Sequence, residues 1–128
     1  MPTYRQHLAQ ADHNERFVSS FDVDSTQFND WVVTGMFYAA LHYVNAYLAY
    51  AGYPPSRYKS HGRREGCMAR DRKLRHDTSL YDCYEDLHND SESARYYMKK
   101  LPPADVRQLR DVQLRTVRDA ILALLPSP

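Results

Sequence analysis

Hydrophobic residues recur every three or four positions along most of the chain, which is the spacing of amphipathic helices. No segment shows the sustained alternation of apolar and polar residues that is typical of half-buried strands. Prolines, glycines and capping residues divide the chain into helical segments, which we expect at about residues 4–19, 27–51, 61–74, 80–100 and 103–125. The pattern predicts an all-α fold, a single domain over residues 1–128 built as an antiparallel bundle of four to five helices.

The ends of these segments have recognisable local signals. Thr3 and Ser60 are suitable N-caps for the first and third segments, because their hydroxyl oxygens can accept the free amide hydrogens of a first turn. Gly52 follows the second segment as a C-terminal stop, and Pro103 suits the first turn of the last one. The fourth segment has the clearest buried stripe, which we expect to contain Leu80, Tyr84, Leu87, Ser91, Ala94 and Met98.

The second segment is the most apolar part of the chain. Residues 37–52, FYAALHYVNAYLAYAG, contain no Asp, Glu, Lys or Arg, and they include five tyrosine or phenylalanine rings. A helix that is apolar on nearly all sides is expected at the centre of a bundle. Its line of small residues, Gly35, Ala39 and Ala46, would let another backbone approach closely. We expect a homodimer through this line and the tyrosine-bearing surface of the same helix.

Tyr38, His42 and Asn45 form a narrow polar strip on this apolar helix. Each needs a hydrogen-bond partner, because an unpaired buried polar group costs about 1 to 3 kcal/mol. Two interpretations are open. The three side chains satisfy one another or a helix end, or they line a cleft or a two-fold interface, where His42 could meet a phosphate or a carboxylate.

Composition and charge restrict the classes of function. The 17 basic residues nearly balance the 16 acidic ones, so any basic site for a nucleic acid must be local. The first residues lack a secretory signal, and no stretch has the roughly 18 to 20 apolar residues that a bilayer crossing needs, so we expect a cytoplasmic protein without a membrane partner. Cys67 and Cys83 are not in a ligand spacing, and no phosphate-binding glycine loop, HExxH run or GxSxG turn is present. The sequence therefore predicts no disulfide, no metal and no cofactor.

The run SHGRR, residues 60–64, is a candidate for a local basic site. If Ser60 caps the third segment, the first-turn amides point outward beside the guanidinium groups of Arg63 and Arg64, an arrangement that favours an anion. His61 lies in the same turn. The alternative is a solvated basic turn that has no ligand.

Several short stretches together resemble the HEPN family of helical domains. They are Phe37-Tyr38-Ala39-Ala40-Leu41-His42 with Gly52 after it, Ser60-His61, and Ala94-Arg95-Tyr96, and Ala11-Asp12-His13-Asn14 matches a subset of relatives. The likeness extends from about residue 27 to residue 125. It implies a bundle of four or five helices, commonly dimeric, that occurs in prokaryotic toxin-antitoxin, defence and nucleotidyltransferase-associated systems. Many members of the family are RNases.

Arg95 and Tyr96, which match the family pattern, are a second candidate for a binding site. The resemblance implies that they lie near Tyr38 and His42 of the central segment, in a shared polar cluster. The alternative is a surface ion pair between Arg95 and Glu92, three residues earlier, which would contribute about 0.2 to 0.5 kcal/mol.

Nuclease members of the family carry an arginine and, a few residues later, a histidine at the start of a late core helix. Only Arg70 and His76 have this spacing here, and they lie at the end of the third segment and in the loop that follows it. Cleavage would need a group that activates the ribose 2′-hydroxyl and a cation that stabilises charge on the phosphate. If the chain cleaves RNA, we expect the catalytic residues to be among His61, Arg63, Arg64, Arg70 and His76.

This departure from the nuclease pattern favours the non-catalytic branch of the family. We expect a HEPN-like binding or accessory module that contacts RNA or a nucleotide and works with a nucleotidyltransferase, toxin or antitoxin partner. Two alternatives stay open, a metal-independent endoribonuclease and a dimeric scaffold without nucleic-acid contact. The residues expected to bind a ligand are Tyr38, His42, Asn45, His61, Arg63, Arg95 and Tyr96.

Overall fold

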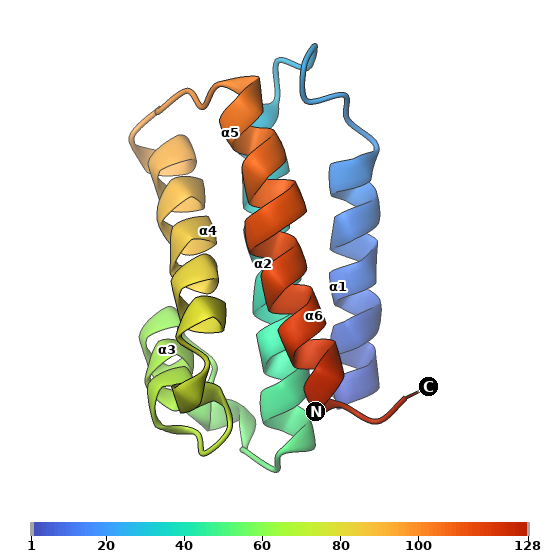
Figure 1. Cartoon of the computed structure of the whole chain (residues 1–128), viewed down its shortest axis with the longest axis vertical. Coiled ribbons are helices and arrows are strands. Elements are labelled where there is room, and N and C mark those ends of the chain that lie inside the picture. The colour runs from blue at the N-terminus through green and yellow to red at the C-terminus, as the bar shows by residue number, and fades with distance from the viewer. Residues whose placement is uncertain (1, 128) are drawn as a thin grey trace.

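The computed structural model describes residues 2–127 and shows an antiparallel helical bundle (Figure 1). Its elements are α1 (Tyr4–Ser19), α2 (Asn29–Tyr50), α3 (His61–Arg70), α4 (Thr78–Tyr96) and a C-terminal rod of α5 (Pro103–Gln108), a π-helical segment (Leu109–Leu114) and α6 (Arg115–Leu124). Two short 3-10 turns, η1 (Pro55–Arg57) and η2 (Leu74–His76), flank α3. No strand occurs between residues 2 and 127, so the all-α prediction is confirmed.

Helix α2 lies at the centre of the bundle, with α1 and α4 on either side and α6 across it (Figure 1). It buries residues on nearly every side of its axis, as the sequence predicts. Ala39 and Ala46 have no exposed surface, and a Cβ atom at Gly35 would lie 2.9 Å from Cδ1 of Phe17 in α1. The small residues are therefore used inside one chain, and Ala39 and Ala46 are not free to form the predicted homodimer contact. None of the helices within residues 2–127 combines the length and hydropathy that crossing a membrane would need.

Buried hydroxyl groups tie α2 to its neighbours. Tyr43 donates a hydrogen bond to the carboxylate of Glu15 in α1, and Nη1 of Arg118 in α6 lies 3.2 Å from the other oxygen of that carboxylate. One carboxylate thus joins three helices. Because both Glu15 oxygens have donors, α1 and α6 can pack over the middle of α2 without an unpaired buried charge.

Asp71 ends α3 earlier than the sequence predicts. The helix was expected to continue to about Leu74, but Asp71 adopts an extended conformation and its side chain is buried. Its carboxylate accepts hydrogen bonds of 2.8 Å from Tyr47 and from Tyr53, and it also accepts the amides of Lys73 and Leu74. Although burial by itself raises the pKa of Asp71, these donated hydrogen bonds outweigh it and lower the pKa.

Helix α4 also ends before its predicted boundary at Lys100. Its last helical residue is Tyr96, and Met98 has a φ of 53°, in the left-handed region that stops a helix. The amide of Lys99 then turns back to the carbonyl of Ser93. Met98 is 86 % exposed and lies outside the buried stripe, so its predicted place in the core is wrong, whereas the other five residues of the stripe are buried.

The predicted caps are present. The hydroxyl of Thr3 accepts the amide of Gln6, and that of Ser60 accepts the amide of Arg63. At the end of α2, Gly52 has a φ of 94°, and the amide of Tyr53 donates to the carbonyl of Leu48. With the bond from the Gly52 amide to the Ala49 carbonyl, this is a Schellman ending, which needs a residue in the left-handed region.

Replacing Gly52 by alanine should lower the free energy of unfolding by about 1 to 2 kcal/mol, because the left-handed backbone places the new Cβ too close to a carbonyl oxygen. Gly62, in the first turn of α3, is the matched control. It has open space around it and a negative φ, so Gly62→Ala should stabilise the chain by up to about 1 kcal/mol through helix propensity. Urea unfolding followed by far-UV circular dichroism measures both, and equal effects would contradict the explanation.

Candidate functional site

A groove of about 390 Å³ runs between α1 and α2. We call it the α1–α2 groove, and it is lined by Gln10, His13, Asn14, Phe17, Trp31, Thr34, Gly35, Tyr38 and His42. Trp31 is 55 % exposed and Tyr38 is 37 % exposed, so two large rings are open to solvent on the same helix. The polar groups around them are amides, imidazoles and hydroxyls, which can both donate and accept hydrogen bonds.

His42 is paired with a histidine that sequence reasoning missed. Nδ1 of His42 lies 3.2 Å from Nδ1 of His7, a buried residue of α1. One of the two nitrogens must donate and the other accept, so the pair is held together when at least one ring is neutral. Burial, followed by the nearby positive charges of His7 and Arg64, lowers the pKa of His42 to about 4. His42 is thus a neutral group at pH 7.

Asn45 has a structural partner in Arg64, and this overturns the expectation that Arg64 is available to an anion. The Arg64 side chain turns inward and is buried, with Nε 2.7 Å from Oδ1 of Asn45 and Nη2 2.9 Å from the carbonyl oxygen of Tyr58. Nη1 lies 3.3 Å from Nδ1 of His61. A guanidinium group inside the protein needs this many acceptors, because a buried charge is costly when it is unpaired.

His61 is packed between rings and lies partly buried. Its ring centroid lies 5.5 Å from that of Phe37 and 4.8 Å from that of His88. Burial lowers the pKa of His61, and the positive charge of neighbouring groups, first His88 and then Arg64, lowers it further. His61 therefore belongs to the packed contact between α2, α3 and α4.

Arg95 lies over the ring of Tyr38, with its guanidinium carbon 5.7 Å from the ring centroid, and 5.2 Å from that of Tyr96. This contact joins α4 to the polar strip of α2. The surface ion pair with Glu92 is not formed within residues 2–127. Among those residues, Nε and Nη1 of Arg95 are buried and have no hydrogen-bond partner. Such donors are rare in proteins, because most buried N–H groups have a partner.

Arg95 also lines a second hollow, of about 660 Å³, which we call the basic hollow. It lies between the loop before α2 and the end of α4, and its lining is Thr26, Gln27, Asn29, Asp30, Ala94, Arg95, Met98, Lys99, Lys100, Leu101 and Pro103. Three of these side chains are cations and one is an anion. Because Tyr38 lines the α1–α2 groove and touches Arg95, the groove and the basic hollow meet at this pair.

Arg63 and Arg70 lie on a different surface, around a third hollow of about 320 Å³ that Arg57 also lines. Nη1 of Arg63 donates to the carbonyl of Ser56, 2.8 Å away. His76 lies in η2, where its Nε2 is 3.2 Å from Nε of Arg75. Within the described residues no hydrogen bond joins Arg70 to His76.

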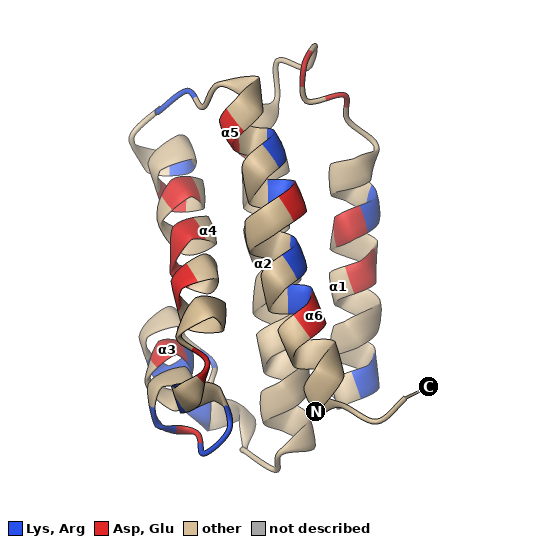
Figure 2. Cartoon of the chain, in the orientation of Figure 1, with Lys and Arg blue, Asp and Glu red and all other residues tan. Residues whose placement is uncertain are grey.

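Positive charge gathers at α3 and the loop that follows it, whereas α4 carries a row of acidic residues (Figure 2). Eight of the 17 lysines and arginines lie between residues 57 and 75, with only two acidic residues among them. Both of those acids are used internally, Asp71 by its hydrogen bonds and Glu65 by His88. The nearly neutral chain therefore has a local basic surface, as the composition requires of any nucleic-acid site.

Sequence reasoning missed Trp31, although the signal for it was present. Trp31, Tyr38 and His42 are separated by seven and then four residues, which places them on one face of α2. It also missed Glu65 and Glu85, which lie beside His88. His7 could not be found in this way, because its partner is 35 residues away.

Comparison of the chain with known protein families, with curated proteins and with solved structures finds no match.

The His7–His42 pair predicts a loss of stability in mild acid. Since the folded pKa of His42, about 4, lies below its ordinary value of 6.5, the unfolded chain takes up the proton more readily. The stability due to the neutral pair is present above pH 6.5 and is lost as the pH falls toward 4. In the wild type, the urea concentration at the midpoint of unfolding should be lower at about pH 5 than at about pH 7.5. The difference should be smaller in His42→Asn. His76→Asn, an exposed control, should behave like the wild type.

Proposed function

We propose that this chain is a non-catalytic module that binds single-stranded RNA or a nucleotide, of the HEPN-like kind that its sequence resembles. The observation that carries the proposal is the meeting of an aromatic groove with a hollow lined by cations, at Tyr38 and Arg95. Tyr38 can stack on a base, and Arg95 beside it can pair with the phosphate of the same nucleotide.

The α1–α2 groove supplies the features that bind an unstacked base. Trp31 and Tyr38 present exposed rings, and stacking of a base on such a ring contributes about 1 to 3 kcal/mol. Gln10 and Asn14 extend from α1 into the same groove, where their amides can hydrogen-bond to base edges. The groove has room for a base, since its volume is about 390 Å³.

The basic hollow supplies the contact with phosphate. Arg95, Lys99 and Lys100 line this hollow. Nε and Nη1 of Arg95 are buried without a partner within residues 2–127, so the side chain has to turn toward the hollow to donate them to a phosphate. A guanidinium group binds phosphate oxygens through two parallel hydrogen bonds, which fixes the ligand's orientation as well as contributing energy. A strand whose base stacks on Tyr38 would place its phosphate next to Arg95.

The arrangement of the histidines favours binding over cleavage. Nδ1 of His61 faces Arg64, and Nδ1 of His88 faces Glu65, so each ring has a partner inside the protein. Arg70 and His76, the pair with the nuclease spacing, lie on separate elements. Cleavage needs a base and a cation on one phosphate, and Arg64, the cation beside His61, is buried with its Nε on Asn45.

The resemblance extends the proposal to partners and location. We place the chain in the cytoplasm of a prokaryote, as an accessory module for a nucleotidyltransferase, toxin or antitoxin. A homodimer would have to use exposed surfaces, such as those that present Phe28 and Tyr50, because the small residues of α2 are covered by α1. A dimer that retains no RNA would favour the alternative of a scaffold.

Trp31 allows a direct test, because it is the only tryptophan of the chain and lies in the proposed groove. Titration with a single-stranded oligonucleotide should quench its fluorescence in a saturable way. Arg95→Gln should weaken binding about tenfold, the value of a charged hydrogen bond, and should reduce the salt dependence by the equivalent of about one phosphate contact.

Arg115→Gln is the matched control, since Arg115 is an exposed arginine of α6 outside the groove and the basic hollow. It should change the affinity by no more than about twofold. The proposal would be abandoned if saturating oligonucleotide left the fluorescence unchanged, or if the two arginine variants lost affinity equally.

Labelled total RNA incubated with the purified chain in the presence of a chelator should stay uncut. The reason is that Arg70 and His76, which have the nuclease spacing, do not line the basic hollow, where we place the phosphate. Discrete fragments that disappear in His61→Ala or His76→Ala would instead establish a metal-independent endoribonuclease.

A further inference from the structure

Helix α4 carries a Glu-x-x-His sequence at Glu85 and His88. This spacing of three residues places the carboxylate and the imidazole on the same face, one turn apart. Helical bundles that hold metal ions use this same spacing, together with a carboxylate from a facing helix.

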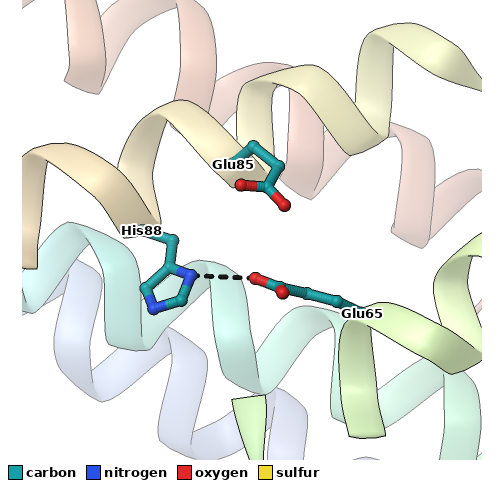
Figure 3. Close-up of side chains that lie close together, drawn as sticks. All are labelled: Glu65, Glu85 and His88. Atoms are coloured by element: carbon teal, nitrogen blue, oxygen red, sulfur yellow. Dashed lines mark hydrogen bonds and ion pairs between the residues drawn. The ribbon is translucent and has the colours of Figure 1, made fainter. Parts of the chain in front are cut away.

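Glu65 of α3 provides the facing carboxylate (Figure 3). One ligand atom from each of Glu65, Glu85 and His88 lies within 4.8 Å of the others, and Nδ1 of His88 is 2.8 Å from Oε1 of Glu65. The close-up shows the two carboxylates and the imidazole arranged around a common space (Figure 3). The side chains are partly buried, since the side chain of His88 is 14 % exposed and that of Glu65 is 21 % exposed.

Two neighbours hold the His88 ring in place. Phe37 of α2 stacks on it, with the ring centroids 4.8 Å apart and the planes at 12°. Oε2 of Glu92 lies 3.6 Å from Nε2, the nitrogen that points away from Glu65. A histidine that binds a metal through one nitrogen commonly has a carboxylate on the other, which fixes the ring and strengthens it as a ligand.

Apart from His88, no basic side chain within residues 2–127 forms an ion pair with the two carboxylates of the cluster. Two carboxylates at this distance repel each other, and the usual compensation in proteins is a cation. A divalent ion would neutralise both and would link α3 to α4.

We propose that Glu65, Glu85 and His88 form a binding site for a divalent first-row transition metal. An imidazole nitrogen suits Zn²⁺, Fe²⁺, Co²⁺ or Ni²⁺ and disfavours Mg²⁺ and Ca²⁺, while the two carboxylates complete a set of three protein ligands. Three protein ligands leave further coordination positions to water. The site is separate from the α1–α2 groove and does not depend on nucleic-acid binding.

The test titrates the full chain with Zn²⁺ by calorimetry and with Co²⁺ by absorption spectroscopy. We expect one ion per chain and a rise in melting temperature, with no comparable effect of Mg²⁺ or Ca²⁺. The Co²⁺ complex should show weak visible bands and lack an intense thiolate band, because the ligand set contains no sulfur. Glu85→Gln should weaken Zn²⁺ binding by about tenfold or more.

Asp82→Asn is the matched control, an exposed carboxylate on the same helix that is outside the cluster, and it should bind like the wild type. His88→Gln should also lose the ion, and circular dichroism shows whether it still folds. If it does not, Glu85→Gln decides the question, because Glu85 lies only partly buried at the edge of the cluster. Absence of binding below about 1 mM, an unchanged affinity in Glu85→Gln, or a thiolate band would overturn the site and leave only a Glu65–His88 hydrogen bond.

Discussion

The central helix has to be surrounded, and the other elements are arranged to satisfy that requirement. Helix α2 is apolar on almost every side, and burying apolar surface stabilises a fold by about 25 cal/mol per Å². Helices α1, α4 and α6 therefore pack along it, and α3 reaches it through the side chains of Arg64 and His61. The few polar groups of α2 then decide how each neighbour docks, because every buried donor or acceptor needs a partner.

These polar groups act as specific connections between elements. His42 is bonded to α1 through His7, and Asn45 is bonded to α3 through Arg64. Tyr43 meets Glu15 of α1, and Tyr47 meets Asp71 at the end of α3. An apolar central helix could pack without these polar side chains, and each of them instead bonds α2 to a particular neighbouring element. The polar strip is thus largely structural, and Tyr38 is the member that faces solvent and a cation.

Two neighbouring residues of α2 connect the proposed sites to one another. Phe37 stacks on His88, whereas Tyr38 contacts Arg95, and these two α4 residues are seven positions apart on one helix face. The proposed metal cluster and the α1–α2 groove are therefore linked through the packing of α2 against α4. A metal ion bound by the proposed cluster would hold α3 to α4, the helix that carries Arg95.

Local sequence alone determined the helices, most of their ends and the central place of α2. The capping side chains, Gly52 and the 3.6-residue periodicity all act through bonds and packing within a few residues, so they can be read in order along the chain. The resemblance that linked Tyr38 to Arg95 also identified part of the surface that we propose as the site, whereas Trp31 was missed although it lies seven residues before Tyr38 on the same helix face.

Only the tertiary structure decided which polar groups are free to bind a ligand. Arg63 and Arg64 are adjacent in sequence, yet one lies at the surface and the other is buried on Asn45. Glu65 and Glu85 meet only because α3 folds against α4, and Asp71 ends α3 only because two tyrosines from elsewhere reach it. A polar side chain can bind a ligand only if no other group of the protein already occupies it. The groups that can occupy it are distant in sequence and come close only when the helices pack.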